Sequence, residues 1–280
     1  MKIKITADST CDLPRELIAK HDIAIVPLTV IKNDAAFKDG VDIFPADIFA
    51  HVAGGGALCS TSACSVGDYE DIFAAHAKDH DAVIHVSLGS NFSSSYQNAC
   101  VAASEFDNVY CVDSMNLTVG QGFIALKASE LADAGMAPQQ IVEELNTLVP
   151  KVEASFLVDK LDYLVKGGRC SSAAALGANL LNLKPCIEVR DGKMTVVKKY
   201  RGNYAKCLAS YIKERLANRE DIDRNSLFVI RTVVSDDCHT AVMDAVQACE
   251  PFENVYENTA GCTISCHCGP GTLGVIFLKK

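Results

Sequence analysis

The stretch AVIHVSLGSNFSSSYQ, residues 82–97, joins an apolar run directly to a serine-rich segment. Residues 82–87 are apolar enough to predict a strand buried on both faces, which is typical of a parallel sheet covered by helices. The serines that follow lie where the next helix, predicted to extend to about Ser104, should begin. In such strand–loop–helix units, ligands bind at the carboxyl ends of the strands. The segment therefore predicts a parallel α/β fold with a polar site at one edge of its sheet.

The rest of the first half repeats this alternation of strand and helix. Further strands are predicted at 2–6, 24–31 and 109–112, and helices at 45–52, 67–78, 119–134 and 138–148. Asp12 and Pro14 offer a cap and a first-turn proline for another helix, which extends to Ala19. Because the two kinds of element alternate, we predict an N-terminal α/β domain of three layers with a parallel sheet in the middle, over residues 1–155.

The pattern changes near Pro150. Helices are predicted at 161–166, 173–183, 204–217 and 237–249, and strands at 186–190, 194–200, 227–234, near Val255 and Thr263, and after the final glycine turn. The pair Asp191-Gly192 is a strong hairpin signal between two of these strands. Hairpins mixed with strand–helix units predict a second α/β domain, of two layers with a mixed sheet, over residues 156–280. The boundary is expected between Pro150 and Asp159.

Composition limits the classes of function. The chain has 280 residues, 49 % of them hydrophobic, and a net charge of −9. An acidic chain without a basic stripe argues against binding to nucleic acid or to an anionic membrane surface. The first ten residues lack the apolar core of a signal peptide, and no apolar run approaches the roughly 20 residues that span a bilayer. We therefore expect a cytoplasmic protein.

Thirteen cysteines are present, three of them in the segment CTISCHC, residues 262–268. Zinc can use cysteine and histidine ligands of this kind. The surrounding pattern predicts a strand, however, and in a strand the three cysteines would share one face while His267 pointed to the other. No second Cys-x-x-Cys pair supports a metal site. We expect no metal, and reduced thiols packed as small apolar groups.

Hydroxyl-rich loops recur along the first half. Thr61 and Ser62 lie in CSTSACS, residues 59–65, just before a predicted helix, and Asp8-Ser9-Thr10 and Asp113-Ser114 follow predicted strands. Each serine could simply cap a helix. Four such loops, counting the one at Ser93, together suggest one polar pocket at one edge of the sheet.

A serine acyl hydrolase is one hypothesis for this pocket, with Ser93 as nucleophile and His267 as base. The elbow G-x-S-x-G is absent around Ser93, and His85 lies in a buried strand, where a core histidine is expected. The glycines of HCGPG, residues 267–271, either form a turn or let the backbone approach a ligand.

A binder of a non-lipid carboxylate or phosphate is another hypothesis. Two basic segments bear on this hypothesis: KGGR, residues 166–169, and KKYRG, residues 198–202. The first either ends a helix or contacts an anion, and the second either ends a strand or places cations beside an anion. No P-loop or glycine fingerprint for a nucleotide is present.

The chain resembles the DegV family of bacterial fatty-acid-binding proteins, which includes the lipid-binding subunit of fatty acid kinase. The resemblance is carried by seven motifs in the family's order: ITADSTCDLP, STSACSVGDY, HVSLGSNFSSSYQNA, VDS, LDYLVKGGRCS, KKYRGNYAKCL and HCGPGTLGV. It implies two α/β domains with a long-chain fatty acid, such as palmitate, in a tunnel between them. The apolar walls of the tunnel are expected from the second domain, and residues 173–183 are a candidate.

The resemblance also implies roles for individual residues. The acyl carboxylate would lie near Thr61, Ser62 and Ser93, and Arg201 and His267 would lie near the carboxylate or the site of phosphate transfer. Two departures from the family's motifs are present: Cys64 replaces a proline, and Ser94-Ser95 replace Gly-Thr. We therefore count Ser94 among the ligand-binding candidates.

The predicted function is that of a binding protein and not of an enzyme. It would bind a long-chain fatty acid and present its carboxylate to a separate ATP-binding kinase subunit, in lipid transport or fatty acid metabolism. No cofactor is expected besides the bound acid. Transient contact with a membrane is compatible with this function.

Overall fold

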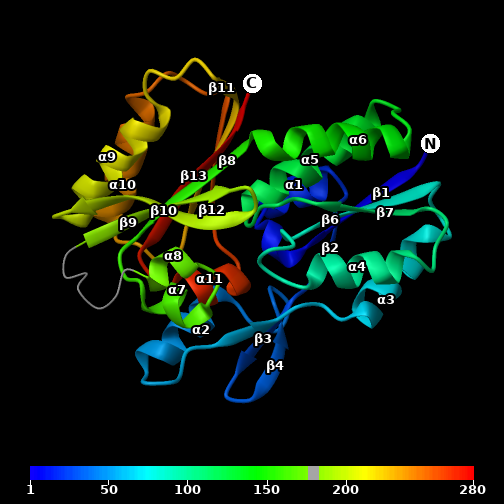
Figure 1. Ribbon diagram of the computed structural model, residues 1–280, viewed down its shortest axis with the longest axis horizontal. Helices are drawn as coiled ribbons and strands as arrows, with labels where there is room; N and C mark the ends of the chain where they lie inside the picture. The colour runs from blue at the N-terminus through cyan, green and yellow to red at the C-terminus, as the bar shows by residue number, and fades with distance from the viewer. Residues whose placement is uncertain (176–182) are drawn as a thin grey trace.

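A computed structural model describes residues 1–175 and 183–280 and shows two large β-sheets with helices around them (Figure 1). The first sheet has four parallel strands, in the order β2 (Ala24–Val26), β1 (Ile3–Asp8), β6 (Ala82–Ser87) and β7 (Val109–Asp113). All six residues of β6 are buried, as the apolar run predicts. The α/β class and the parallel sheet of the first half are confirmed.

Helices cover both faces of the parallel sheet. One face is covered by α5 (Val119–Asp133) and α6 (Pro138–Leu148), the other by α3 (Val66–Ala77) and α4 (Ser95–Ala103). The short α1 (Arg15–Lys20) lies beside α5, where His21 and Ser129 are hydrogen-bonded. The predicted cap is wrong in one detail, because Pro14, and not Asp12, occupies the N-cap of α1.

The second sheet has six strands and is mixed. Its order is β10 (Lys193–Arg201), β9 (Leu183–Arg190), β8 (Val152–Val158), β13 (Thr272–Lys279), β11 (Ile222–Arg231) and β12 (Asn254–Thr259). Only β11 and β12 run parallel; the other neighbours are antiparallel. The predicted hairpin is present, and Asp191 and Gly192 both have positive φ, as its tight turn requires. The expected boundary between residues 155 and 156 falls inside β8.

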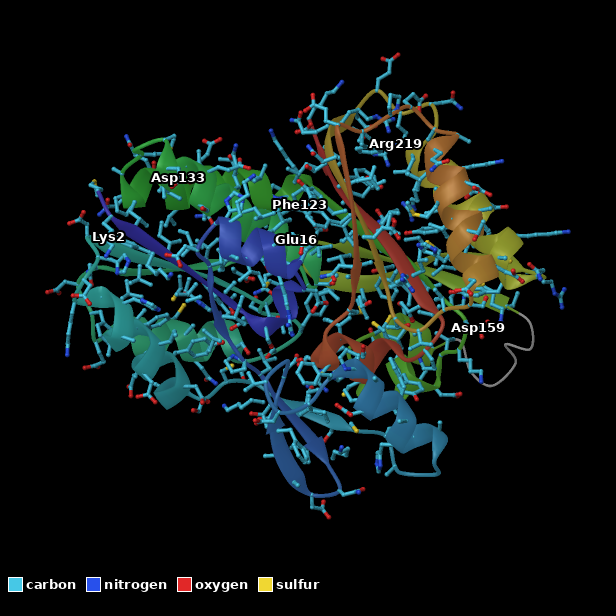
Figure 2. All side chains as sticks on the ribbon, turned by 180° about the vertical axis from the view of Figure 1, so that it is seen from behind. Lys2, Glu16, Phe123, Asp133, Asp159 and Arg219 are labelled. Carbon is cyan, nitrogen blue, oxygen red and sulfur yellow. The ribbon has the colours of Figure 1, made fainter. Side chains whose placement is uncertain are left out.

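The two faces of this sheet belong to different cores. Along β11, Leu227 and Val229 pack with α9 (Tyr204–Leu216) and α10 (Asp236–Gln247), whereas Phe228 and Ile230 belong to the core shared with the parallel sheet. Figure 2 shows Phe123 of α5 where the two halves of the molecule meet, and its ring lies 4.9 Å from that of Phe228, edge to face. The halves therefore share one continuous apolar core.

A small third sheet departs from the prediction for residues 24–31. Instead of one strand, the chain breaks at Pro27 and Leu28 between β2 and β3 (Thr29–Lys32), because proline cannot donate to a ladder. The antiparallel order is β4 (Ala35–Lys38), β3 and β5 (Ser60–Ser62), with α2 (Pro45–Ala53) nearby. Thr61, on β5, lies opposite Val30 of β3 in this small sheet.

The segment CTISCHC forms a helix, α11 (Cys262–Cys268), so the predicted strand near Thr263 is wrong. Cys262 and Cys266 are four residues apart and therefore share one helical face, which packs with Val30, Ile43, Ile48 and Cys59. The backbone amides of Cys262 and Thr263 donate to the Asp39 carboxylate at 2.9 and 3.0 Å. These bonds satisfy the first amides of the helix, which a strand prediction cannot anticipate.

Two short helices precede β9. The first, α7 (Asp162–Gly167), is followed by the C-cap Gly168, which has positive φ, as the double glycine predicts. The second, α8 (Ser171–Ala174), covers only the start of the helix predicted at 173–183, and residues 176–182 lie outside the described part of the chain. Two 3₁₀ turns, η1 (Ser9–Cys11) and η2 (Val149–Lys151), are also present. No helix among the described residues is long and apolar enough to cross a membrane.

Candidate functional site

Two adjoining cavities lie between the parallel sheet, the six-stranded sheet and α11. The first, here called the polar chamber, comprises about 490 Å³ of space between atoms, part of it open to solvent. The second, here called the apolar chamber, comprises about 410 Å³. Leu117, Ile264 and Cys268 line both, so the chambers share a wall.

The polar chamber gathers hydroxyl and imidazole groups from three distant segments. Thr61 comes from β5, Ser93 from the loop before α4, and His267 from α11. The Thr61 Oγ1 lies 2.8 Å from the His267 Nε2. The Ser93 Oγ accepts the backbone amide of Ser95 at 3.1 Å and lies 2.9 Å from the Ser95 Oγ. The serine-rich loop is thus folded on itself with Ser93 facing the chamber.

Two buried polar atoms of α11 lack partners in this chamber. Within the described part of the chain, neither the His267 Nδ1 nor the Thr263 Oγ1 has a hydrogen-bond partner. Thr263 and His267 are four residues apart, so they share one face of α11. Buried polar groups are usually paired, and an unpaired group calls for a specific explanation, such as a ligand or an unseen water.

His267 is held neutral by its surroundings. Burial, and secondly the charge of Arg169, lower the pKa of His267 from its usual 6.5 to about 4. Gly167 is required beside it, because a Cβ at that position would lie 2.4 Å from the His267 Nδ1. A neutral imidazole next to the Thr61 hydroxyl can donate or accept a hydrogen bond, according to its tautomer.

Arg169 supplies the cation of the polar chamber. Its Nη1 donates to the carbonyl of Gly167 at 2.8 Å, and its side chain is exposed at the chamber's edge. No carboxylate among the described residues lies within ion-pair distance of it. A guanidinium that has no carboxylate partner and lies beside hydroxyl groups suits a carboxylate or a phosphate ligand.

The apolar chamber is walled by the inner face of the six-stranded sheet. Its lining includes Ala154, Phe156, Val189, Ile230 and Ile276, from four strands of that sheet. Ala260, from the loop before α11, and Leu117, from the loop before α5, line it too. Arg231 and four residues with hydroxyl groups line the chamber as well: Thr118, Ser155, Thr232 and Thr272. The four hydroxyls are hydrogen-bonded to other groups of the protein, so the apolar side chains leave room that suits an aliphatic chain.

A buried carboxylate fixes the start of the serine-rich loop. The Asp8 carboxylate accepts bonds from the Tyr69 hydroxyl at 2.6 Å, the Ser87 hydroxyl at 2.9 Å and the Leu88 amide at 2.7 Å. Burial opposes its ionisation, but His85 and these donors outweigh burial and lower the pKa of Asp8. His85 is fully buried, as predicted for a core histidine.

A second carboxylate, that of Asp12, is hydrogen-bonded to the residue that precedes α11. Asp12 accepts the Thr118 hydroxyl at 2.7 Å and the Gly261 amide at 2.9 Å. It therefore ties the loop before α5 to the N-terminus of the helix that carries His267. Burial raises the pKa of Asp12 well above its usual range, against the effect of the Thr118 bond.

The predicted site residues divide into two groups. Thr61, Ser62, Ser93 and His267 line the polar chamber together. Ser94 and Arg201 do not line either chamber: Ser94 is the exposed N-cap of α4, and Arg201 is exposed at the end of β10.

Only two of the four hydroxyl-rich loops reach the chambers. In the other two, the hydroxyls are hydrogen-bonded to groups of the surrounding fold. Ser9 accepts the Leu28 amide, Thr10 donates to Gln121, and Ser114 donates to the Asn116 carbonyl. The departure at Cys64 is buried, where its thiol donates to the Pro27 carbonyl at 3.5 Å.

Sequence reasoning did not identify Thr263 as a site residue. For Arg169 it allowed two interpretations, the end of a helix or a contact with an anion. The missed signal is the helical spacing of Thr263 and His267, which the strand prediction hid.

The arrangement lacks parts of a hydrolase and of a metal centre. His267 is bonded to Thr61 and not to Ser93, and no carboxylate in the described chain orients its Nδ1. A Ser-His pair without an orienting acid lacks the geometry of a triad. Among residues 1–175 and 183–280, no three His, Cys, Asp or Glu side chains lie close enough together to hold a metal ion.

Comparison with known proteins assigns the chain to a class. A family model described as "Uncharacterised protein, DegV family" matches residues 2–280. The chain therefore belongs to the DegV family, as its motifs indicate.

Particular relatives match over their whole length. The protein DegV of Bacillus subtilis is 31% identical over 287 residues, covering 100% of both chains. The solved structure of a fatty-acid-binding DegV family protein from Thermus thermophilus superposes with a TM-score of 0.92 at 30% identity, again over 100% of both. A stearic-acid-binding protein from Eubacterium ventriosum gives a TM-score of 0.84 at 26% identity, over 99% of this chain and 98% of that one.

Proposed function

We propose that this protein binds a long-chain fatty acid, with the carboxylate in the polar chamber and the acyl chain in the apolar chamber. The observation that carries the proposal is the pairing of the two chambers. One has two polar atoms without hydrogen-bond partners and a cation without a carboxylate partner, and the other, which shares its wall, is lined largely by apolar side chains. Residues of 1–155 and of 156–280 contribute to both. The fatty acids bound by the relatives from Thermus thermophilus and Eubacterium ventriosum support it.

The energetics favour a ligand with both parts. Burying about 14 methylenes at about 0.8 kcal/mol each would release on the order of 11 kcal/mol before the costs of association are subtracted. A carboxylate carried into the site without partners would cancel much of that gain. The hydroxyls of Thr61, Ser62 and Ser93, with Arg169, would supply those partners.

Lipid analysis of protein produced in bacteria tests this proposal first. We expect native mass spectrometry to show a bound mass that denaturing extraction identifies as a long-chain fatty acid. After the lipid is removed, palmitate should bind far more tightly than hexadecanol, which has the same chain without a carboxylate, and more tightly than octanoate, which has half the chain. Folded protein that carries no lipid and binds palmitate no better than either control would contradict the proposal.

The second part of the proposal concerns presentation of the acid. We infer that the bound carboxylate is offered to a separate ATP-binding kinase subunit in the cytoplasm, and that this chain performs no turnover alone. The exposed edge at Arg169 supports this role, because a partner could approach the carboxylate there. Cationic donors are most useful where phosphate transfer adds charge, which favours a role for Arg201 at that step. His267, which burial keeps neutral, would contribute there as a hydrogen-bonding group.

A paired assay separates binding from transfer. Arg201→Ala should bind palmitate nearly as tightly as the unmodified protein, because Arg201 does not line either chamber. With a fatty acid kinase subunit and ATP, the same variant should yield little acyl phosphate. If Arg201→Ala supports normal acyl phosphate formation, Arg201 has no part in transfer; product formed without the kinase subunit would contradict the non-enzymatic role.

A further inference from the structure

The apolar chamber extends away from α11 along two strands of the six-stranded sheet. At its α11 end, the hydroxyl of Thr272, on β13, donates to the Cys268 carbonyl at 2.9 Å, and Cys268 belongs to the wall that the two chambers share. Further along β13, Ile276 lines the apolar chamber, as Ile230 does on the neighbouring β11. An acyl chain whose carboxylate lies in the polar chamber would therefore extend toward Ile230 and Ile276.

A separate cavity, here called the outer cavity, lies beyond these two residues. It comprises about 1310 Å³ of space between atoms, part of it open to solvent. Its lining includes Leu278 of β13 and Ser226 of β11. Residues two or four positions apart in a strand share a face, so the outer cavity and the apolar chamber lie against the same face of the sheet. On β11 the residue between Ile230 and Ser226 on that face is Phe228.

Three aromatic rings form the wall between the apolar chamber and the outer cavity. Phe228 is 1% exposed, and its partners on the adjacent strands are Ile276, which lines the chamber, and Tyr256. Its ring lies 4.9 Å from that of Tyr256, stacked at 24°, and 4.9 Å from that of Phe123, edge to face (Figure 2). Tyr256 and Phe123 line the outer cavity. Phe228 is therefore the middle of a wall only a few side chains thick.

We propose that Phe228 is the end stop of the acyl-chain site and sets the longest fatty acid that the protein accepts. The proposal rests on the binding of a fatty acid in the two chambers. Protein interiors are closely packed, so methylenes that reach the Phe228 ring have no room unless that ring moves. Without the ring, the chamber would open into the outer cavity, where Leu17, Leu126 and Leu278 could cover the end of a longer chain.

A competition between two saturated acids tests the end stop. Lipid-free unmodified protein and Phe228→Ala are each mixed with equal amounts of palmitate and arachidate, which has four more methylenes. Native mass spectrometry then measures the ratio of bound arachidate to bound palmitate. Each additional methylene that becomes fully buried is worth up to about fourfold in affinity. We expect the ratio to rise by at least about tenfold in Phe228→Ala, which requires burial of only some of the added methylenes.

Three further variants control for packing and for the path of the chain. Phe228→Leu, a milder change, should shift the ratio in the same direction by less. Phe277→Leu is its matched control, because Phe277 is fully buried on β13 but packs in the core on the other face of the sheet, and it should leave the ratio unchanged. Adding Leu126→Lys to Phe228→Ala places a charge in the outer cavity and should cancel the gain.

The outcomes separate the end stop from the binding function itself. Circular dichroism checks that each variant is folded. An unchanged ratio in folded Phe228→Ala or Phe228→Leu that still binds palmitate would overturn the end stop and leave the binding function intact. An equal shift in Phe277→Leu would also overturn it, since the shift would then come from loosened packing. Unmodified protein that binds neither acid would instead contradict the proposed function.

Discussion

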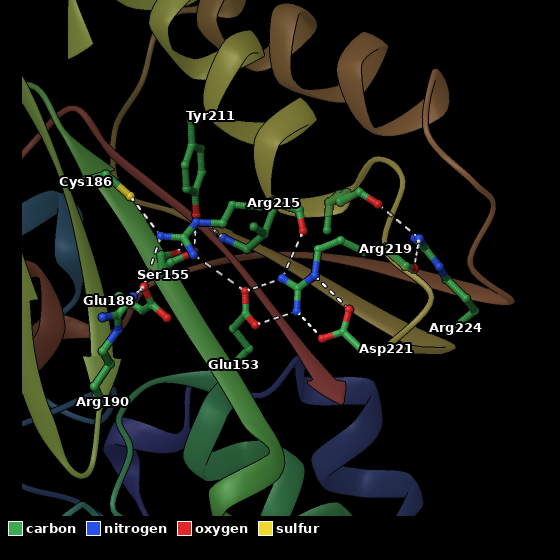
Figure 3. Close-up of polar contacts among 12 residues, drawn as sticks. Glu153, Ser155, Cys186, Glu188, Arg190, Tyr211, Arg215, Arg219, Asp221 and Arg224 are labelled. Carbon is green, nitrogen blue, oxygen red and sulfur yellow. Dashed lines mark hydrogen bonds and ion pairs between the residues drawn. The ribbon is translucent and has the colours of Figure 1, made fainter. Parts of the chain in front are cut away.

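Arg219 and Arg169 have opposite surroundings. Figure 3 shows Arg219 between two carboxylates: it donates to both oxygens of Glu153 at 2.7 and 2.9 Å and to Asp221. Glu153 is 8% exposed and also lies 3.6 Å from Arg215, whose other partner is Glu188. Arg169, at the edge of the polar chamber, has no carboxylate partner in the described chain.

The difference separates two uses of charge in one molecule. Around Glu153 every cation faces an anion, so the network is complete without any ligand. In the polar chamber, Arg169 has no carboxylate partner, and the Thr263 hydroxyl and the His267 Nδ1 have no hydrogen-bond partner within the described residues. A complete network contributes to stability, whereas an incomplete one is available for binding. Substitutions in the first region should therefore change the free energy of unfolding, and substitutions in the second should change affinity.

The largest effect is expected from Glu153→Ala. Removing this buried carboxylate leaves Arg219 and Arg215 partly buried without their shared partner, which should lower the free energy of unfolding by about 3–4 kcal/mol. The change in the free energy of unfolding is measured by urea unfolding of protein from which the fatty acid has been removed. Asp221→Ala is the matched control, because Asp221 is mostly exposed and also pairs with Arg219; its loss should cost less than about 1 kcal/mol. Equal losses would mean that burial does not set the strength of the network.

The next effect concerns pH and His267. The unfolded chain protonates this imidazole near pH 6.5, but the folded protein does so only near pH 4. Between these values the unfolded state binds more protons, so stability should fall as pH decreases from about 6.5 to about 4, by roughly 2–3 kcal/mol in total.

The measurement is the free energy of unfolding at several pH values for the unmodified protein and for His267→Gln. In the variant, the decrease in the free energy of unfolding between about pH 6.5 and about pH 4 should be smaller by roughly 2–3 kcal/mol. The decrease caused by other titrating groups should remain. Parallel pH profiles for the two proteins would show that His267 is not kept neutral by burial.

A smaller effect, on affinity, is expected from Ser93→Ala. A hydrogen bond to a carboxylate is worth roughly 1.5 kcal/mol, so palmitate should bind about tenfold more weakly. Ser94→Ala is the neighbouring control, because the Ser94 side chain is exposed and makes no capping bond. Calorimetry on both variants measures the change. If Ser94→Ala weakens binding as much as Ser93→Ala, the carboxylate is bound elsewhere.

The smallest effect is expected from Arg169→Ala. Because its guanidinium is exposed, its attraction to the bound carboxylate should be about 1 kcal/mol, or about fivefold in affinity, at low salt. The effect should shrink as salt is added, since solvent ions screen exposed charges. Palmitate titrations at two salt concentrations test it, with Arg201→Ala as the control. A loss that salt does not change would assign Arg169 a packing role.

Much of the fold follows from local pattern. The parallel strands at Ile3–Asp8, Ala82–Ser87 and Val109–Asp113 are apolar runs with clear turn signals, and the hairpin at Asp191-Gly192 follows from two residues. The break at Pro27 was missed because the residues around it are apolar on both sides. The helix at Cys262–Cys268 was missed because tertiary contacts decide it: Asp39, more than 220 residues away, accepts its first amides.

The site was predicted less completely than the fold. Thr61, Ser62, Ser93 and His267 follow from motifs, and they line one chamber. Arg169 and Thr263 depend on which face of a helix or loop meets the chamber, and a sequence does not give that orientation. Ser9, Thr10 and Ser114 look equally suitable in sequence, but their hydroxyls are used inside the fold.

The hydrogen bond between Thr61 and His267 joins residues 206 positions apart, and this separation has a consequence for synthesis. At roughly 5–20 residues per second, about 10–40 s pass between the emergence of the two residues from a ribosome. During that time β5 has been made, but α11, which completes the wall of both chambers, has not. A nascent chain can therefore form its parallel sheet early, yet it cannot hold a ligand in both chambers until α11 has been made.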